Sequence, residues 1–168
     1  MPFDAQTSLF ADIGAPEYMA HLSSRDRETL MMARDILRRV VADRDVIGSW
    51  AALTDYLGAA LAPLRVEAFR VLFLDRKNRL IRDEEIGRGS VDHVPVYPRE
   101  VARRALELGA SAVILAHNHP SGDPTPSQAD IDMTQQVRAI MDALGITLHD
   151  SVICGGGDVL SMRAEGLL

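Results

Sequence analysis

The feature of the sequence that most constrains the fold is a strand, a helix and a second strand in succession in the second half of the chain. Residues 111–117 (SAVILAH) form an apolar stretch typical of a buried strand. A helix is predicted from about Ser127 to Leu144, because apolar residues recur on one face: Met133, Val137, Ile140, Met141 and Leu144. Gly145 ends this helix before the apolar segment 146–154 (ITLHDSVIC). This order predicts an α/β fold with a mixed sheet flanked by helices.

The first part of the chain predicts a helical lead-in. Residues 1–22 are weakly patterned and form an arm. Apolar residues at helical spacing predict a helix over 25–43, with Ser23 and Asp26 as a possible capping box at its start. A second helix is expected over 49–60, with Trp50, Leu53, Tyr56 and Leu57 along one side.

Four further elements lie between this lead-in and the strand at 111–117. Residues 66–75 (VEAFRVLFLD) read as a buried strand that turns at 75–78 into a returning strand, RLIRDEEIG, which together predict a β-hairpin. The segment 91–98 is expected to be extended. Pro98 then suits the first turn of a helix that Gly109 ends.

Composition bounds the size and the partners. A chain of 168 residues with 47% hydrophobic content can bury one core. Its net charge of -6 gives no general cationic surface for nucleic acid, although Arg34, Arg38 and Arg39, and Arg99, Arg103 and Arg104, form local basic clusters. No signal sequence or membrane span is predicted, so we expect a cytoplasmic protein. Its single cysteine, Cys154, excludes an intramolecular disulfide and a thiolate zinc cluster.

The candidate chemistry follows the strand at 111–117, in the string HNHPSGDPTPSQAD. His117 and His119 are two residues apart on a strand, so both side chains point the same way with Cα atoms about 6.6 Å apart. A loop stiffened by prolines leads to Ser127, a good helix N-cap, and Asp130 falls in the first turn of the helix. Two histidines and one aspartate with a fourth position left to water are typical of a catalytic zinc site.

Each part of this pattern also has a structural explanation. Ser127 and Asp130 alone form an ordinary helix capping box. An isolated H-x-H pair is commonly hydrogen-bonded or exposed. Packing alone does not require the combination, and we therefore interpret it as a metal site.

The segment from His117 to Asp130 resembles the H-x-H-P and S-x-x-D signature of the JAB/MPN (JAMM) metalloenzymes. The fuller string, with EAFRVLFLD upstream and EGLL at the end, resembles the bacterial RadC family, historically labelled DNA repair proteins. This resemblance implies a JAB/MPN-like, cytidine-deaminase-like architecture over residues 45–168, preceded by an arm and helix at 1–44. It also implies a zinc ion (Zn²⁺) held by His117, His119 and Asp130.

The same resemblance implies a metallopeptidase or isopeptidase that cleaves an amide bond in a peptide or protein with zinc-activated water. Glu67 matches the family's general base, and Ser127 matches the residue that donates a hydrogen bond to the developing oxyanion. A carboxylate between Val66 and Ala68 is also costly to bury without a partner. Glu84 and Glu85 are the competing candidates, in a charged run expected to be solvated.

The alternative function is a non-catalytic or DNA-repair-associated accessory module. Residues 1–44 show no Gly-rich hairpin between helices of the kind that RadC-like proteins use toward DNA, and this weakens the nucleic-acid link. His149 lies two positions before the family's usual histidine. It is expected to be a buried structural residue, like His93 and Cys154. The sequence predicts no oligomeric state.

Overall fold

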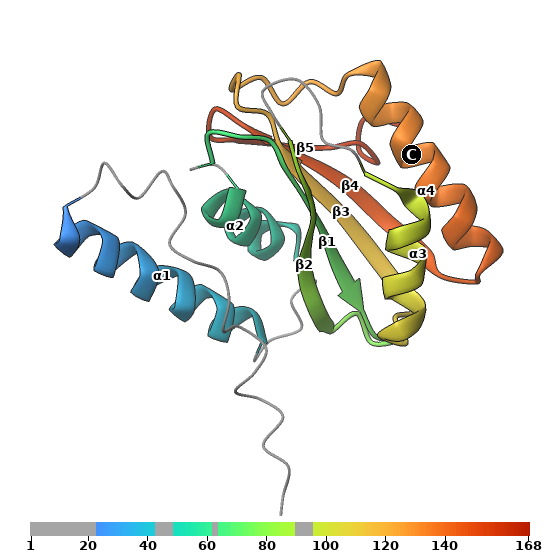
Figure 1. Ribbon diagram of the computed structural model, residues 1–168, viewed down its shortest axis with the longest axis horizontal. Coiled ribbons are helices and arrows are strands. Elements are labelled where there is room, and N and C mark those ends of the chain that lie inside the picture. Colours follow the sequence, from blue (N-terminus) through green and yellow to red (C-terminus); the bar gives the residue numbers. More distant parts are fainter. Residues whose placement is uncertain (1–22, 43–48, 62–63, 90–95) are drawn as a thin grey trace, which may run out of the picture.

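The structure is a computed structural model that describes residues 23–42, 49–61, 64–89 and 96–168. Four helices and five strands are present in these residues (Figure 1). In chain order they are α1 (Ser24–Ala42), α2 (Trp50–Leu61), β1 (Ala68–Leu74), β2 (Leu80–Arg88), α3 (Pro98–Glu107), β3 (Ala112–Asn118), α4 (Gln128–Ala143), β4 (Thr147–Gly155) and β5 (Asp158–Ser161).

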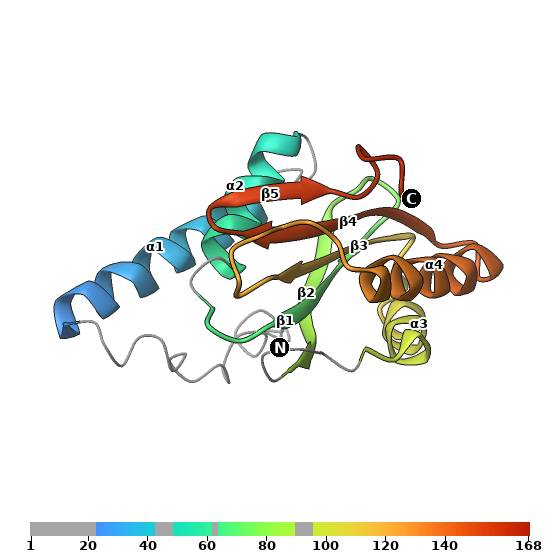
Figure 2. The same ribbon diagram turned by 90° about the horizontal axis from the view of Figure 1, so that it is seen from above.

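The five strands form one sheet in the order β2-β1-β3-β4-β5 (Figure 2). β3 pairs parallel with β4, whereas the other neighbouring pairs are antiparallel. The parallel pair is joined through α4, which makes the strand, helix and strand unit expected from the sequence. The predicted mixed α/β sheet is therefore confirmed.

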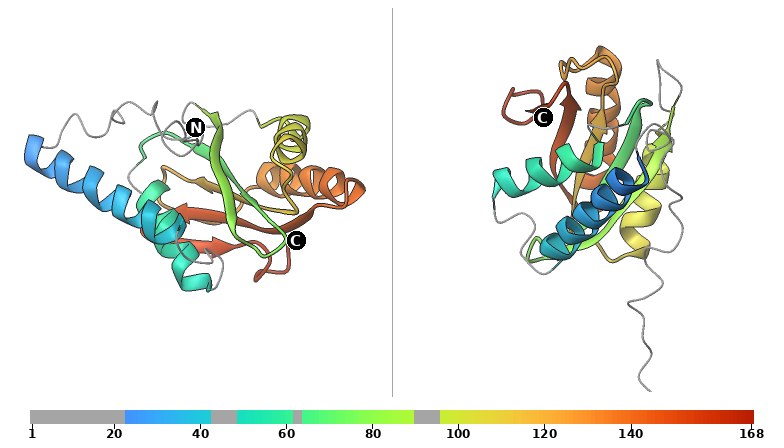
Figure 3. Two further views of the ribbon diagram at one scale, coloured as in Figure 1. Left: turned by 90° about the horizontal axis from the view of Figure 1, so that it is seen from below. Right: turned by 90° about the vertical axis from the view of Figure 1, so that its left-hand side faces the viewer.

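The two faces of the sheet are covered by different helices (Figures 1 and 3). α2 packs on one face against side chains that include Ala68, Leu72 and Ala116. α3 and α4 pack on the other face against Phe69, Val71 and Leu115, among others. Neighbouring residues of β1 and β3 thus alternate between the two layers, as strand geometry requires. The face under α3 and α4 is the one that His117 shares.

A buried ion pair joins β1 to β2 under α2. Nε of Arg70 lies 3.0 Å from Oδ1 of Asp83, and the hydroxyl of Tyr56 in α2 donates to the same carboxylate. Asp83 holds the pKa of Arg70 above its ordinary value, although burial alone would lower that pKa. Removing one charge of this pair would leave its buried partner with weaker support, from Glu85 at 3.7 Å for Arg70 or from the Tyr56 hydroxyl for Asp83.

Most predicted elements are present within two residues of their expected ends. Gly109 follows α3 with a φ of 62°, the left-handed conformation that favours glycine after a helix. Trp50 differs from expectation: it is 47% exposed, whereas Leu53, Tyr56 and Leu57 are buried on the predicted side of α2. The extended segment predicted at 91–98 lies outside the described residues except for its last three, and so does His93.

α1 lies apart from the sheet and contacts α2 (Figures 1 and 3). The Ser23 half of the predicted capping box is present at its start, since the Ser23 hydroxyl accepts from the main-chain N–H of Asp26 over 3.2 Å and donates to the Asp26 carboxylate over 2.6 Å. Leu30, placed on its predicted apolar face, is 41% exposed. None of the described helices is long and apolar enough to cross a bilayer.

Candidate metal centre

The two histidines lie where β3 ends. His117 is fully buried in the strand, and His119 is the first residue after Asn118 and is half-buried. Their Nε2 atoms are 3.1 Å apart, and the rings approach with centroids 4.9 Å apart. Phe69 of β1 stacks on the His117 ring at 5.8 Å between centroids. The predicted same-face arrangement of the pair is therefore present in the structure.

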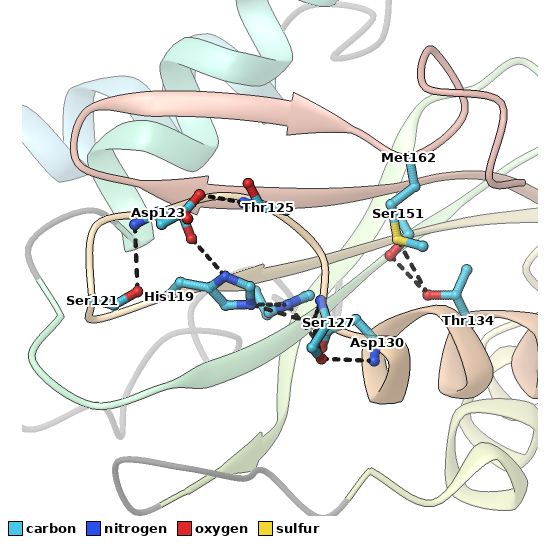
Figure 4. A network of polar contacts seen from close by, with 10 residues as sticks. His119, Ser121, Asp123, Thr125, Ser127, Asp130, Thr134, Ser151 and Met162 are labelled. Atoms are coloured by element: carbon cyan, nitrogen blue, oxygen red, sulfur yellow. Dashed lines mark hydrogen bonds and ion pairs between the residues drawn. The ribbon is translucent and has the colours of Figure 1, made fainter.

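Asp130 reaches both histidines from the first turn of α4. Its Oδ1 lies 3.2 Å from Nε2 of His117, and its Oδ2 lies 3.4 Å from Nε2 of His119. Ser127 is the N-cap of α4, and its hydroxyl donates to Oδ2 of Asp130 over 2.6 Å (Figure 4). The main-chain N–H of Ser127 donates to the same oxygen over 2.8 Å. The carboxylate thus closes the capping box and faces the histidines at once.

These three residues fit a divalent metal by the chemistry of their donor atoms. One nitrogen from each histidine and one oxygen of Asp130 all lie within 4.8 Å of one another. Imidazole nitrogens with a carboxylate oxygen are ligands that zinc accepts readily, and three such ligands leave a fourth position open. The structure therefore brings together the set that the sequence predicted to hold zinc.

Contacts of the second ring nitrogens differ between the two histidines. Nδ1 of His119 lies 2.8 Å from the main-chain oxygen of Asp123 (Figure 4). A proton on this Nδ1 leaves the Nε2 lone pair free for a metal, an orientation common among histidine ligands. Nδ1 of His117 is buried and has no hydrogen-bond partner in the described part of the chain. Of the two histidines, His119 is therefore the one whose second ring nitrogen is supported in the described residues.

The cluster shifts the pKa values of its members in opposite directions. Burial alone would raise the pKa of Asp130, but hydrogen bonds from His117, His119 and Ser127 hold it far below the ordinary value. The hydrogen bond with Asp130 raises the pKa of His119 despite burial, and the charges of Asp130 and Glu67 act in the same direction. Negative charge therefore gathers beside the histidines, as a cation site requires.

The loop between β3 and α4 is held against the turn between β4 and β5. The main-chain N–H of His119 donates to the carbonyl of Cys154 over 2.8 Å. A Cβ placed on Gly155 would lie 2.9 Å from the main-chain nitrogen of Pro124, and one on Gly156 would lie 2.6 Å from the carbonyl oxygen of Gly122. Glycines are thus needed here because the two backbones touch, which fixes the path of the loop that carries the Asp123 carbonyl.

Glu67, the predicted base, immediately precedes β1 and is half-buried. Its main-chain carbonyl accepts from the N–H of Gly89 over 3.0 Å. Its carboxylate charge acts on His119, although Glu67 is not part of the three-residue ligand cluster. Glu67 therefore lies near the candidate metal ligands without being one of them. Its catalytic role stays a prediction.

The competing acids, Glu84 and Glu85, lie further along the hairpin and are ion-paired rather than merely solvated. Arg104 of α3 binds Glu84 through two hydrogen bonds, which lower the pKa of that carboxylate. Arg88 binds Glu85 over 2.7 Å and 2.9 Å. The lowered pKa makes Glu84 a poor candidate for accepting a proton from water near neutral pH, and Glu85 is occupied by its two hydrogen bonds from Arg88.

Two supporting residues of the site escaped the sequence interpretation. Asn118 stands between the histidines and is buried, with hydrogen bonds to the segment that carries Glu67. Asp123 contributes its main-chain oxygen to His119. A signal existed for Asn118 alone, because an amide at the end of a strongly apolar strand must find partners when it is buried.

Cys154 and His149, which were expected from the sequence to be structural, both contact residues outside the candidate metal centre. Cys154 is 1% exposed within the core on the α2 face, and burial raises the pKa of its thiol to about 12. His149 is half-buried rather than buried, and its Nε2 lies 2.8 Å from Oδ1 of Asn78 in the turn between β1 and β2.

The sheet, the two helical layers and the clustered histidines and aspartate together define an α/β domain with a candidate metal centre. The family model described as the RadC-like JAB domain matches residues 47–167, and the chain therefore belongs to this family. The resemblance inferred from the sequence is confirmed. The separation into an arm and helix at 1–44 and a metallohydrolase domain at 45–168 stays a prediction.

Two curated relatives are similar over most of the chain. A UPF0758 protein of Rhodobacter capsulatus is 64% identical over 136 residues, which cover 81% of this chain and 64% of the relative. A UPF0758 protein of Ruegeria pomeroyi is 62% identical over 136 residues, which cover 81% of this chain and 61% of the relative. The matched region thus spans less than two thirds of the length of either relative.

Proposed function

We propose that this RadC-like domain is a zinc-dependent hydrolase of the JAMM/MPN type that cleaves an amide bond in a peptide or protein. The observation that carries the proposal is the ligand set, in which His117, His119 and Asp130 place donor atoms within 4.8 Å of one another. A cap at the start of α4 would not by itself require two histidine nitrogens against its carboxylate. The proposed setting is the cytoplasm.

Zinc bound by these three residues would supply Lewis acidity, which lowers the pKa of a water molecule and polarises a carbonyl. Glu67 would accept the proton of that water while the water oxygen forms the new bond to the carbonyl carbon. The C–N bond then breaks, and Glu67 returns the proton to the leaving nitrogen. Water is the only co-reactant: its oxygen and one proton end in the new carboxylic acid, and its other proton ends on the amine.

Ser127 is proposed to assist as a hydrogen-bond donor to the oxyanion that develops on the carbonyl. In the structure its hydroxyl proton is directed at Oδ2 of Asp130, and the same hydroxyl accepts from the main-chain N–H of Asp130 over 3.2 Å. The donor would have to turn from the carboxylate to the oxyanion. The Ser127 hydroxyl has one proton, so it can donate either to Asp130 or to the oxyanion, but not to both at once.

An accessory role toward DNA is supported less well by the charges of the described residues. Arg103 is paired with Glu100 and Glu107, and Arg104 with Glu84 and Glu107, so the basic cluster on α3 is largely neutralised. The chain as a whole carries 24 acidic and 18 basic residues. Phosphate contacts, by contrast, require unpaired cationic side chains. The side chains of Arg34, Arg38 and Arg39 lie outside the described part.

Metal analysis is the first test of the proposal. Purified protein should carry about one equivalent of zinc after reconstitution at neutral pH, and the His117→Ala, His119→Ala double variant should carry none. Glu67→Gln should retain the metal, because Glu67 lies outside the ligand cluster. Substoichiometric zinc in the native protein would remove the basis of the proposal.

A peptide-library screen then separates hydrolysis from an accessory role. Native protein and Glu67→Gln would be compared on the same library, with metal content measured in both. Zinc-dependent cleavage that disappears in Glu67→Gln is the expected result. Equal behaviour of the two proteins, together with submicromolar DNA binding at physiological salt, would favour the accessory module instead.

A further inference from the structure

Asn118 occupies the position between the two histidines but contacts a different part of the molecule. It is the last residue of β3 and is 2% exposed. Because side chains alternate along a strand, its amide lies on the opposite face from His117 and His119. Oδ1 accepts from the main-chain N–H of Ala68 over 2.9 Å. Nδ2 donates to the carbonyls of Val66 over 3.0 Å and Leu64 over 3.4 Å.

This amide continues the pairing of β1 with β3 beyond the end of the ladder. The described register ends where Phe69 faces His117. A carboxamide offers one acceptor and two donors, so it can bond a neighbouring backbone as a peptide group would. Asn118 does so toward Ala68, the first residue of β1, and toward Val66 and Leu64 before it, so one side chain holds this segment to β3.

Glu67 lies inside the segment that Asn118 binds. The residues on either side of it, Val66 and Ala68, bond to the Asn118 amide, while its own carbonyl accepts from Gly89 at the end of β2. The main chain of Glu67 is thus fixed both from β3 and from β2. The Cα of Glu67 is therefore fixed relative to both neighbouring strands, and so is the direction in which its side chain leaves the backbone.

The same alternation directs Glu67 toward the metal centre. Ala68 packs in the core layer under α2, and Phe69 packs in the layer under α3 and α4, where it stacks on His117. Glu67 lies two residues before Phe69 on extended backbone, so its side chain points to the same face as that of Phe69, which is the face of the histidines. The charge of Glu67 also raises the pKa of His119, which agrees with this direction.

We propose that Asn118 is a positioning residue whose carboxamide holds the segment 64–68 so that the Glu67 carboxylate stands beside His117, His119 and Asp130. The inference rests on the proposed function, since Glu67 is the residue proposed there to move the proton. Asn118 itself would touch neither the metal nor the substrate. It acts through Glu67 alone.

Amide hydrogen exchange of the metal-free protein tests the anchoring. In Asn118→Ala, exchange at Ala68 and Gly89 should accelerate about tenfold or more, because the segment loses its three bonds to β3. Zinc affinity should stay within about threefold of native, since none of the three ligands bonds to the Asn118 side chain, whereas support by a ligand's own partner is worth about 10- to 100-fold. Leu57→Ala is the matched control, because it removes a fully buried side chain of the same core layer.

A double-mutant comparison tests whether Asn118 acts through Glu67. Cobalt(II) would replace zinc, and the visible spectrum and hydrolysis of the peptide library would be recorded for Glu67→Gln, Asn118→Ala and the double variant. Asn118→Ala should change the spectrum as Glu67→Gln does and lower turnover about 10- to 100-fold. It should add nothing in the Glu67→Gln background. Leu57→Ala should keep the native spectrum.

The outcomes separate this inference from the proposed function. An altered spectrum in Glu67→Gln but a native one in Asn118→Ala would overturn the positioning role alone. Equal changes in Leu57→Ala would assign the effect to general destabilisation and overturn it as well. Failure of the native protein to bind zinc or cobalt would overturn the proposed function. Faster exchange at Ala68 in Asn118→Ala would then show that Asn118 only stabilises the backbone of segment 64–68.

Discussion

Nδ1 of His119 and the main-chain oxygen of Asp123 lie 2.8 Å apart, within the loop that joins β3 to α4. This contact keeps Nε2 of His119 directed at Asp130 and His117. The raised pKa of His119 means that the metal-free protein holds a proton on this imidazole at a higher pH than a free histidine does. Metal and proton therefore compete for the same nitrogen.

We expect zinc binding to release a proton near neutral pH and zinc affinity to fall as the pH drops through the pKa of His119. The sign is opposite for the metal-free fold: a raised pKa stabilises it below the ordinary histidine pKa, and this contribution disappears as the pH rises through the raised value. Calorimetric titration in buffers of different ionisation enthalpy measures the released protons. A binding enthalpy identical in every buffer would contradict this expectation.

Ser127→Ala should weaken both α4 and the metal centre. The variant loses the N-cap, which costs about 0.5–2 kcal/mol in the free energy of unfolding. It also frees Oδ2 of Asp130 from a 2.6 Å hydrogen bond, so zinc affinity should fall about tenfold. Chemical denaturation and zinc competition with a chelator measure the two effects.

Ser49→Ala is the control, because Ser49 accepts from the N–H of Ala52 at the start of α2, away from the metal centre. It should lose a similar stability and retain native zinc affinity. Equal losses of affinity in both variants would show that the effect of Ser127 is only general destabilisation.

Gly155→Ala should displace the metal-binding loop. The added Cβ would meet main-chain atoms of Gly122, Asp123 and Pro124 at 2.9–3.0 Å, so the backbone that orients His119 has to shift. We expect zinc affinity to fall about 10- to 100-fold, as for other losses of a ligand's supporting contacts. Gly58→Ala in α2 meets no atom within 4 Å and should be neutral or stabilising by up to about 1 kcal/mol. Native zinc affinity in Gly155→Ala would show that the loop does not depend on this close approach.

Cys154 should be inert in the folded protein. Burial raises the pKa of its thiol to about 12, so the reactive thiolate is scarce at pH values where an exposed cysteine is ionised. Because the chain has a single cysteine, mass spectrometry after iodoacetamide treatment reports this thiol directly. Alkylation should need denaturant, and rapid labelling of the native protein would place Cys154 outside the core.

The clustering of the candidate metal ligands could be predicted from the sequence because it depends on local geometry. His117 and His119 share a face by strand alternation, and Ser127 with Asp130 follows the pattern of a helix cap. The physical surroundings of Glu67 could not be read in this way, since they depend on the register that sets Phe69 opposite His117, residues far apart in the chain. The sequence offered two grounds for that glutamate, the family resemblance and the cost of burying a carboxylate between Val66 and Ala68, but neither of them gives its spatial neighbours.

Charge pairing shows the same limit. The sequence places Arg104 in a basic cluster, yet in the structure its guanidinium is bound to Glu84 and Glu107. The partner Glu84 comes from β2, and its approach depends on how α3 packs over the sheet. Likewise, the exposed Trp50 fits the apolar side of α2 by spacing but lies where that side extends beyond the core.

The double use of the Asp130 carboxylate constrains how this domain can change during evolution. Oδ2 accepts from the N–H and the hydroxyl of Ser127, while Oδ1 faces His117, so a substitution that removes the proposed metal ligand generally removes half of the capping box too. Asparagine is the exception, because it keeps an oxygen acceptor for the cap but loses the charge that attracts a cation. If the proposed metal site is real, Asp130→Asn is therefore the mildest single change by which a descendant could lose the metal and keep the fold.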